Sequence, residues 1–343
     1  MNELVLPRPD DWHLHLRDGP VLRDAVAATA AVFGRALVMP NLKPPITTTE
    51  AARAYHDRIR LVAPPGFTPY PALYLTDATT PAEVRRAKAS GVVLAAKLYP
   101  AGATTHSDAG VTDVRRLAPV FAAMEEVDLV LCLHGEVVDP DVDVFDREAV
   151  FLERTGSWLV ETFPRLRLVL EHVTTAQGVG FVYSGHDRVA ATITPQHLLL
   201  DRNDLFVGGL QPHHYCLPVL KRRLHREALL EAAISGSPRF FLGTDSAPHP
   251  RHAKESACGC AGCFTAPHAL ALYAEAFDQA GALARLPDFA SGFGADFYGL
   301  PRATTQVRLV RRTTSVPQAY PFGSDEVVPL RAGGTVAWQV APA

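Results

Sequence analysis

The stretch Asp10-Asp11-Trp12-His13-Leu14-His15-Leu16-Arg17-Asp18 decides how the rest of the chain is interpreted. Side chains alternate along a β-strand, so His13 and His15 are expected to point to the same side. Two neighbouring imidazoles make half of a metal site. A single pair of this kind is explained equally well by polar residues on a solvated strand face, so the remaining chain must decide.

Apolar runs typical of buried strands recur along the chain, and segments with apolar residues at helical spacing lie between them. Eight such runs occupy residues 12–16, 36–39, 72–75, 92–98, 129–133, 166–170, 189–193 and 240–242. Helical segments are predicted at 21–33, 48–61, 81–89, 111–124 and 217–234. Eight strand–helix units predict an α/β fold, a closed (β/α)8 TIM barrel. A doubly wound open sheet is the second choice, but no glycine-rich turn follows the first strand.

The length of 343 residues suits a single barrel domain over residues 1–343. Two connections, 196–216 and 246–267, are too long for plain turns, and their composition predicts shaped loops over a site. From about residue 302 the chain holds short strand-like pieces, at 306–310 and 334–338, which predict a terminal appendage.

Composition and charge exclude several classes of protein. The net charge is −3 with both signs well mixed, so no broad basic face is expected to bind nucleic acid. No apolar run is long enough to cross a membrane, and the N-terminus lacks the basic start and apolar block of a secretory signal. We therefore expect a cytoplasmic protein without a membrane partner.

The five cysteines do not form the even, spread framework of a secreted disulfide scaffold. Cys132 and Cys216 stand singly, and Cys258, Cys260 and Cys263 cluster, so reduced thiols are expected. The cluster offers only three sulfurs and lacks the second paired half of a zinc ribbon. It is interpreted as part of a substrate loop.

Polar residues follow the predicted strands at the end where barrel enzymes carry their chemistry. They are His13, His15, Arg17, Asn41, Lys97, His134, Glu136, Glu171, His172, Asp245 and His249. Each has an ordinary explanation alone, because a lysine can reach solvent, a histidine can be satisfied in the core, and an aspartate can cap a helix. Independent accidents would not place all of them at one end of a barrel.

Four imidazoles and a carboxylate exceed what one tetrahedral zinc accepts, and they fit two zinc ions better. An ammonium on Lys97 would be repelled by two dications. A neutral Lys97 amine that takes up CO2 becomes a carbamate, an anionic ligand with two oxygens, which nearby metals would stabilise. The sequence thus predicts a binuclear metal centre at the C-terminal ends of the strands, bridged by carboxylated Lys97.

The same residues carry a resemblance to a known family. An H-x-H pair, a lysine on the fourth strand, single histidines on the fifth and sixth, and an aspartate on the eighth resemble the amidohydrolase superfamily. Within it the chain is most similar to the short bacterial class (class II) of dihydroorotases. The matching segments are DDWHLHLRDG, VMPNL, KLYPAGATT, HGEV, EHVTT, ATITPQHLLLDRND, HHYCLPVLKR and GTDSAPHPRHAKESACGCAGC. They span Asp10 to about Pro267, and the resemblance thins from Phe289 onward.

The resemblance implies reversible ring closure of N-carbamoyl-L-aspartate to L-dihydroorotate, a step of pyrimidine synthesis. The implied ligands are His13, His15 and Asp245 for one zinc, His134 and His172 for the other, and carboxylated Lys97 bridging both. A hydroxide shared by the two zinc ions would attack the ring amide carbonyl. Asp245 would carry the proton from that water to the leaving nitrogen.

Substrate contacts are implied around this centre. They are Arg17, Asn41, Thr104, Thr105, His134, Leu217, His249 and Ala261. Arg17, Asn41 and His249 would hold the substrate carboxylate, for which arginine offers a planar bidentate fork. Backbone groups of Leu217 and Ala261 would pair with the amide edges of the ring. The expected assembly is a homodimer.

Segment 101–110 follows the strand of the bridging lysine and is small and polar. Its composition favours an ordinary surface loop, but its place over the metals favours a lid. A flexible, charged carbamoyl-aspartate must be desolvated and held folded to cyclise. In the resembling family a mobile lid carries paired threonines, which would be Thr104 and Thr105 here.

Two alternatives stay open. One is an amidohydrolase that acts on another cyclic amide or ester, and the other is a catalytically dead homologue with a structural role. Dead homologues typically lose metal ligands, whereas every ligand is present in this sequence. The second alternative is therefore the weaker.

Overall fold

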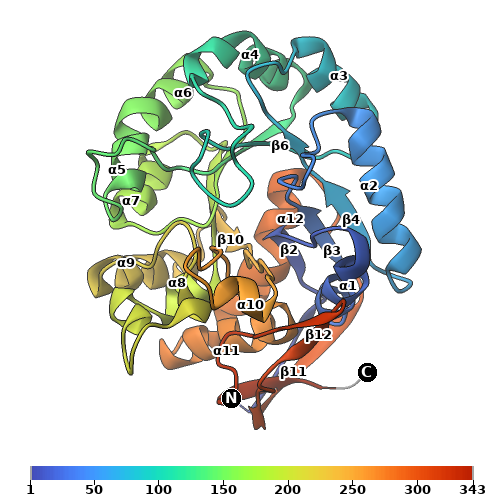
Figure 1. Cartoon of the computed structure of the whole chain (residues 1–343), viewed down its shortest axis with the longest axis vertical. Helices are drawn as coiled ribbons and strands as arrows, with labels where there is room; N and C mark the ends of the chain where they lie inside the picture. Colours follow the sequence, from blue (N-terminus) through green and yellow to red (C-terminus); the bar gives the residue numbers. More distant parts are fainter. Residues whose placement is uncertain (1, 342–343) are drawn as a thin grey trace.

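The computed structural model describes residues 2–341. Parallel strands form its centre, and helices surround them (Figure 1). The strands are β2 (Asp10–Leu14), β3 (Arg35–Val38), β4 (Thr68–Pro71), β5 (Leu73–Tyr74), β6 (Ala95–Leu98), β7 (Val130–Leu133), β8 (Leu168–Leu170), β9 (Val189–Ile193) and β10 (Phe240–Leu242). Strands β2 to β4 pair in parallel in one sheet, and β5 to β10 pair in parallel in a second.

Short links join the two sheets into a closed barrel. Leu14 of β2 forms a parallel bridge with Ser246, which lies shortly after β10. On the other side only Ala72 separates β4 from β5, and its N–H donates to Val38 O of β3 at 2.9 Å. The predicted (β/α)8 barrel is therefore confirmed, with β4 and β5 together making its third strand.

The third strand differs from the predicted run 72–75 because it begins at Thr68 and consists of two pieces. Pro69 and Pro71 lie in β4 and have no N–H to give to a neighbouring strand, which shortens its ladder. Further boundaries were wrong: β2 runs from Asp10 only to Leu14, before His15, β6 begins only at Ala95, and β8 begins only at Leu168.

Helices follow most of the strands. They are α1 (Leu22–Ala30), α2 (Thr49–Val62), α3 (Pro81–Ala89), α4 (Ala118–Val127), α5 (Arg147–Phe151), α6 (Ser157–Thr162), α7 (Ala176–Ser184), α8 (Pro195–Leu199), α9 (Arg223–Ile234), α10 (Arg251–Lys254), α11 (Ala269–Gln279) and α12 (Phe293–Tyr298). Threonines cap α2 and α3: Thr48 Oγ1 accepts from Ala51 N at 3.1 Å, and Thr80 Oγ1 accepts from Glu83 N at 3.3 Å.

Two predicted helices begin later than expected. The segment predicted at 217–234 becomes helical only at Arg223, since Pro218 disfavours helical backbone at Leu217. The segment predicted at 111–124 reaches α-helical geometry at Ala118, after a 3-10 turn at Val114–Leu117. The long connections 196–216 and 246–267 are not purely irregular, because they contain most of α8 and all of α10.

Side chains of the barrel strands alternate between an outer core under the helices and an inner core. The inner core consists of Trp12, Leu37, Met39, Ala72, Ala95, Val130, Cys132, Val169, Ala190 and Phe241, together with Ala295 and Tyr298 of α12. Trp12 stacks on Tyr298 with ring centroids 4.5 Å apart, which fills one end of the barrel. Alternation along β6 carries from Ala95 to Lys97, so the fully buried Lys97 also lies inside the barrel, toward its other end.

The N-terminal segment and the tail form a separate antiparallel sheet, at the bottom of Figure 1. It holds β1 (Glu3–Pro7), β11 (Gln306–Ser315) and β14 (Thr335–Val340), and β12 (Tyr320–Phe322) pairs with β13 (Asp325–Val327). Strand β1 was not predicted. That residues from about 302 form an appendage to a single domain stays a prediction, although this segment is tied to the N-terminus by β1.

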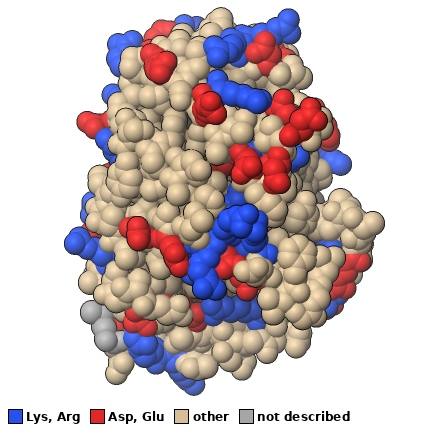
Figure 2. Space-filling view, turned by 90° about the vertical axis from the view of Figure 1, so that its left-hand side faces the viewer, with Lys and Arg blue, Asp and Glu red and all other residues tan. Residues whose placement is uncertain are grey.

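The surface mixes charges of both signs. On the face shown in Figure 2, groups of Lys and Arg lie beside Asp and Glu. Within residues 2–341, none of the helices combines the length and the hydropathy that a bilayer crossing requires.

Candidate metal centre

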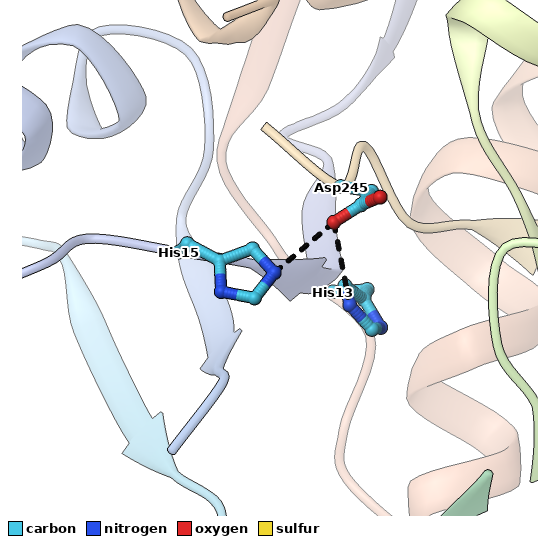
Figure 3. A group of neighbouring side chains, drawn as sticks. All are labelled: His13, His15 and Asp245. Atoms are coloured by element: carbon cyan, nitrogen blue, oxygen red, sulfur yellow. Dashed lines mark hydrogen bonds and ion pairs between the residues drawn. The ribbon is translucent and has the colours of Figure 1, made fainter. Parts of the chain in front are cut away.

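The closing seam of the barrel brings the first three predicted ligands together (Figure 3). His13 lies in β2, His15 follows that strand, and Asp245 follows β10. Asp245 Oδ1 lies 3.1 Å from His15 Nε2 and 3.5 Å from His13 Nε2. One ligand atom from each of the three lies within 4.8 Å of the others. This geometry suits one metal ion.

The remaining predicted ligands lie beside this group. His134 follows β7 and His172 follows β8, and their ring centroids are 4.9 Å apart. The His172 ring is also 4.9 Å from the His13 ring. Lys97 reaches the same interior from β6, and its Nζ lies 5.1 Å from the ring of Tyr99. Three strands, β6, β7 and β8, therefore supply a second group next to the first.

Burial sets the protonation of these groups. It lowers the pKa of Lys97, of His134 and, most strongly, of His172, so that their neutral forms are favoured. Burial alone would raise the pKa of Asp245, but the hydrogen bond with His15 and the proximity of His13 outweigh it and lower that pKa. Burial also lowers the pKa of His15 to about 4, which keeps this imidazole neutral. Neutral imidazoles and an ionised carboxylate are the forms that bind metals.

Two buried nitrogens show that the group fits a metal centre. Lys97 Nζ and His172 Nδ1 have no hydrogen-bond partner within residues 2–341. A buried polar atom without a partner costs about 1–3 kcal/mol. A carbamate on Lys97 and a metal at His172 would satisfy both atoms, and imidazole with carboxylate is a donor set that zinc accepts.

Residues without a predicted role orient the ligands. Glu171 Oε2 lies 2.8 Å from His13 Nδ1. Thr192 Oγ1 donates to Glu171 Oε2 at 2.5 Å and accepts from His172 N at 2.8 Å. Carboxylates commonly orient metal-bound imidazoles in this way. Glu171 was recognised only as a charged residue at a strand end, and Thr192, in the interior of β9, gave no signal in the sequence.

Similar support surrounds the other ligands. Glu136 Oε2 lies 2.8 Å from His134 Nε2. Asp11 accepts hydrogen bonds from Thr244 Oγ1 at 2.5 Å, Thr244 N at 2.9 Å and His13 N at 3.2 Å, and burial raises its pKa to about 7. Asp11 therefore couples the strand of His13 to the segment that carries Asp245. The sequence could have suggested a structural role for Asp11, which lies beside the His13–His15 pair, but it could not have identified Thr244 as its partner.

Two ligands have strained backbones. His172 and Asp245 adopt φ angles of 41° and 46°, in the left-handed region that residues other than glycine rarely occupy. Such strain costs of order 1–3 kcal/mol per residue and persists only where the surroundings enforce it. Hydrogen bonds to the backbone at both places, from His172 N to Thr192 Oγ1 and from Asp245 N to His13 O at 2.7 Å, supply part of that support.

A small cavity lies over the ligands. It measures about 20 Å³ and is lined by His13, His15, Arg17, Asn41, Tyr99, Thr104, Thr105, His134, His172, Leu217, Asp245, Ala247, Ala261 and Gly262. Every predicted site residue except Lys97 and His249 thus lines one cavity. Lys97 is fully buried in the barrel interior, and His249 Nε2 lies 2.8 Å from Arg17 Nη2.

Arg17 supplies the positive charge that lines the cavity, and His249 lies directly behind it. Burial lowers the pKa of Arg17 to about 10, which leaves it charged at neutral pH. Burial, and then the charge of Arg17, lower the pKa of His249 to about 2, so this imidazole is neutral. Arg17 Nε donates to Pro248 O at 2.9 Å, and Tyr55 Oη donates to Arg17 O at 2.5 Å. The guanidinium is therefore fixed in place and suits a carboxylate.

Segment 101–110 is folded over this cavity. Asn41 Nδ2 donates to Thr105 O at 2.9 Å, and Thr105 Oγ1 donates to Ala261 O at 3.4 Å. His106 Nδ1 lies 3.2 Å from Asn41 O. The residues predicted to contact a substrate thus contact one another in this structure.

The cysteine cluster borders the same region. All five cysteines are unpaired in the structure. Cys258 Sγ and Cys260 Sγ are 3.7 Å apart near the surface, whereas Cys263 and Cys216 are buried. That the cluster belongs to a substrate loop rather than a metal site stays a prediction.

Comparisons with known proteins agree with this geometry. The sequence pattern of the amidohydrolase family matches residues 5–304. A dihydroorotase of Picosynechococcus sp. is 59% identical over 344 residues, which covers 100% of this chain and 99% of the relative. The crystal structure of a dihydroorotase from Saccharomyces cerevisiae, in complex with 5-fluoroorotic acid, is 33% identical with a TM-score of 0.91 and covers 99% of both chains. A dihydroorotase structure from Campylobacter jejuni is 35% identical with the same TM-score, over 99% of this chain and 98% of that one.

Proposed function

The chain belongs to the amidohydrolase family and, within it, to the dihydroorotases, and from this premise we propose how its residues carry out the reaction. The activity is that of a cyclic amide hydrolase in pyrimidine biosynthesis, with N-carbamoyl-L-aspartate and L-dihydroorotate as its substrates. Full-length similarity to dihydroorotases is the observation that carries this function. No specific observation favours the two alternatives, an amidohydrolase for another cyclic amide and an inactive homologue.

We propose two zinc ions per chain, held by the two adjacent groups of ligands. His13, His15 and Asp245 would hold one ion, His134 and His172 the other, and Lys97, as a carbamate, would bridge them. The unpartnered Lys97 Nζ and His172 Nδ1 support this assignment. When bound there, the ions would lower the pKa of a water molecule and polarise the amide carbonyl.

Asp245 is proposed as the general base and acid. Its carboxylate lies at the floor of the cavity, and the neighbouring His15 and His13 keep its pKa low enough for the ionised form. In the hydrolytic direction one carboxylate oxygen would accept the proton of the attacking water. The same oxygen would then give the proton to the leaving ring nitrogen, and ring closure runs these steps in reverse.

The substrate carboxylate is proposed to bind Arg17, Asn41 and His249. Arg17 supplies a fixed charge, Asn41 Nδ2 supplies a donor, and neutral His249 can donate from one ring nitrogen. Backbone groups of Leu217 and Ala261 would meet the amide edges of the ring. The same set of groups would be expected to bind 5-fluoroorotic acid, which carries both a carboxylate and a cyclic imide.

Segment 101–110 is proposed as a lid that must open. A cavity of about 20 Å³ holds little more than one water molecule, so the substrate cannot enter while Thr105 and Asn41 are in contact. On closing over substrate, the hydroxyls of Thr104 and Thr105 would turn to it as donors and exclude water.

A direct assay tests the function. Loss of dihydroorotate absorbance on addition of purified, zinc-supplemented protein is expected, as is its return when N-carbamoyl-L-aspartate is supplied at lower pH. Absence of turnover in both directions, with metals bound, would refute it. A homodimer and a cytoplasmic location are kept as proposals, and sedimentation analysis would test the first.

A further inference from the structure

Lys254, at the end of α10, is a buried cation outside the ligand groups. It is 3% exposed. Its Nζ donates to Tyr215 O and to Cys260 O, both at 2.8 Å, and lies 5.6 Å from the centre of the Tyr215 ring. In the described chain, residues 2–341, no Asp or Glu forms an ion pair with it. Burial lowers the pKa of Lys254 as it does that of Lys97. Unlike Lys97, however, Lys254 has two carbonyl acceptors and an aromatic ring beside its ammonium, and these stabilise the charged form.

The two carbonyls belong to the two loops that border the cavity. Tyr215 lies two residues before Leu217, and Cys260 O belongs to the peptide unit that also contains Ala261 N–H. This peptide bond is trans. In a planar trans peptide the N–H points opposite to the C=O. A side chain that fixes Cys260 O therefore also fixes the direction of Ala261 N–H.

This loop needs external support because its backbone is strained. Cys260 adopts a φ of 28°, between Gly259 at 69° and Gly262 at 150°. A cysteine in this region costs free energy and stays there only if its surroundings hold it. Besides Lys254, the one backbone link between the loops in the described residues is Gly262 N, which donates to Tyr215 O at 3.0 Å.

The backbone of Ala261 borders the cavity. Its carbonyl accepts from Thr105 Oγ1 at 3.4 Å and lies 3.1 Å from His249 Nε2. Its N–H has no acceptor among residues 2–341, although Ala261 lines the cavity. A free donor at this place is what a ring carbonyl or amide oxygen of the substrate requires.

We propose that Lys254 is a positioning residue for substrate binding: its ammonium fixes and polarises the Cys260–Ala261 peptide so that Ala261 N–H is directed at the substrate. A donor to a carbonyl strengthens the N–H of the same peptide as a hydrogen-bond donor. The inference deepens the proposed function and rests on the substrate contact assigned there to Ala261. It predicts a defect in binding rather than in the chemical step.

Lys254→Met tests this, because methionine keeps the length of the side chain and removes its donors. We expect the KM for L-dihydroorotate and the Kd for 5-fluoroorotic acid to rise about tenfold, which corresponds to losing most of one hydrogen bond from Ala261 N–H. The value of kcat should stay within about threefold, since the metals and Asp245 are untouched. Metal content should match the wild type, and the protein should stay folded with a melting temperature only slightly lower, because two carbonyls lose a donor. Lys88→Met is the matched control, because Lys88 Nζ also donates to a backbone carbonyl, Asp128 O at 2.7 Å, and lines no part of the cavity.

Three results would overturn the inference. One is a wild-type KM and Kd in Lys254→Met. Another is a fall in kcat with KM unchanged. The third is loss of metal or of the folded state, which would make Lys254 a support of the whole fold. Inactive wild-type protein would instead refute the proposed function, and binding of 5-fluoroorotic acid to both proteins would still test Lys254.

Discussion

The hydroxyl of Thr192 provides the sharpest test of how the metal ligands are held. It donates to Glu171 Oε2 at 2.5 Å and accepts from His172 N at 2.8 Å, so one atom supports ligands of both proposed metals. Thr192→Val replaces the hydroxyl with a methyl group of similar size. The substitution leaves the packing of a fully buried side chain almost unchanged.

The expected cost follows from the two lost hydrogen bonds. His172 N–H would be left buried without an acceptor, at about 1–3 kcal/mol, and the carboxylate of Glu171 would lose a donor worth about 1.5–3 kcal/mol. Local relaxation recovers part of this sum. We therefore expect metal affinity to fall about 10- to 100-fold, which is typical when a group that orients a ligand is lost.

Metal retention is the assay. Wild-type and variant proteins are dialysed against increasing concentrations of a zinc chelator, and bound zinc is counted before turnover is measured. Thr192→Ser keeps the hydroxyl and should retain metal like the wild type. Wild-type retention in Thr192→Val, or equal loss in Thr192→Ser and Thr192→Val, would refute the argument that the hydroxyl matters.

Other predictions concern single residues of the site. Asp245→Asn should lower turnover by about 10²- to 10⁴-fold with little change in melting temperature, because the amide cannot accept the proton, and a smaller loss in steady-state rates would count against the proposed shuttle. Thr104→Ala and Thr105→Ala should each lower turnover while zinc analysis finds both metals, and wild-type rates in both variants would argue against the lid. Glu148 accepts four hydrogen bonds at 2.5 to 2.9 Å, from the N–H and hydroxyl groups of Thr174 and Thr175, two and three residues after His172. Glu148→Gln should therefore weaken zinc retention, whereas Glu83→Gln, which alters a similar carboxylate contact to a helix start at Thr49, should affect only thermal stability; equal retention in the two variants would contradict this.

The barrel and the gathering of the ligands could be predicted because both follow from local patterns. The strand pattern predicted that His13, Lys97 and His134 lie at one end of parallel strands. In the structure His13 and His134 line one cavity, and Lys97 is buried in the barrel interior. The boundaries were less certain. Proline split the third strand at Pro71, and Pro218 delayed the start of α9.

Contacts between distant parts of the chain could not be predicted from the sequence. Strand β1 pairs with β11, about three hundred residues away, and a five-residue segment contains too little information to predict which strand it pairs with. Thr192 looks like any β-branched strand residue, and its role depends on a neighbouring strand. Lys254 is the single lysine of the predicted loop 246–267, but its proposed role depends on the orientation of one peptide unit, which the sequence does not show. Such roles are set by geometry rather than by residue type.

The central proposal is a pair of zinc ions bridged by a modified lysine, and one crystallographic measurement tests it most directly. An anomalous difference map at the zinc edge, from crystals of fully loaded and active protein, should show two peaks per chain. Density for a carboxylate should extend from Lys97 Nζ to both peaks, with His13 and His15 beside one and His134 and His172 beside the other. A single zinc peak in active protein, or an unmodified ammonium at Lys97, would contradict the proposal.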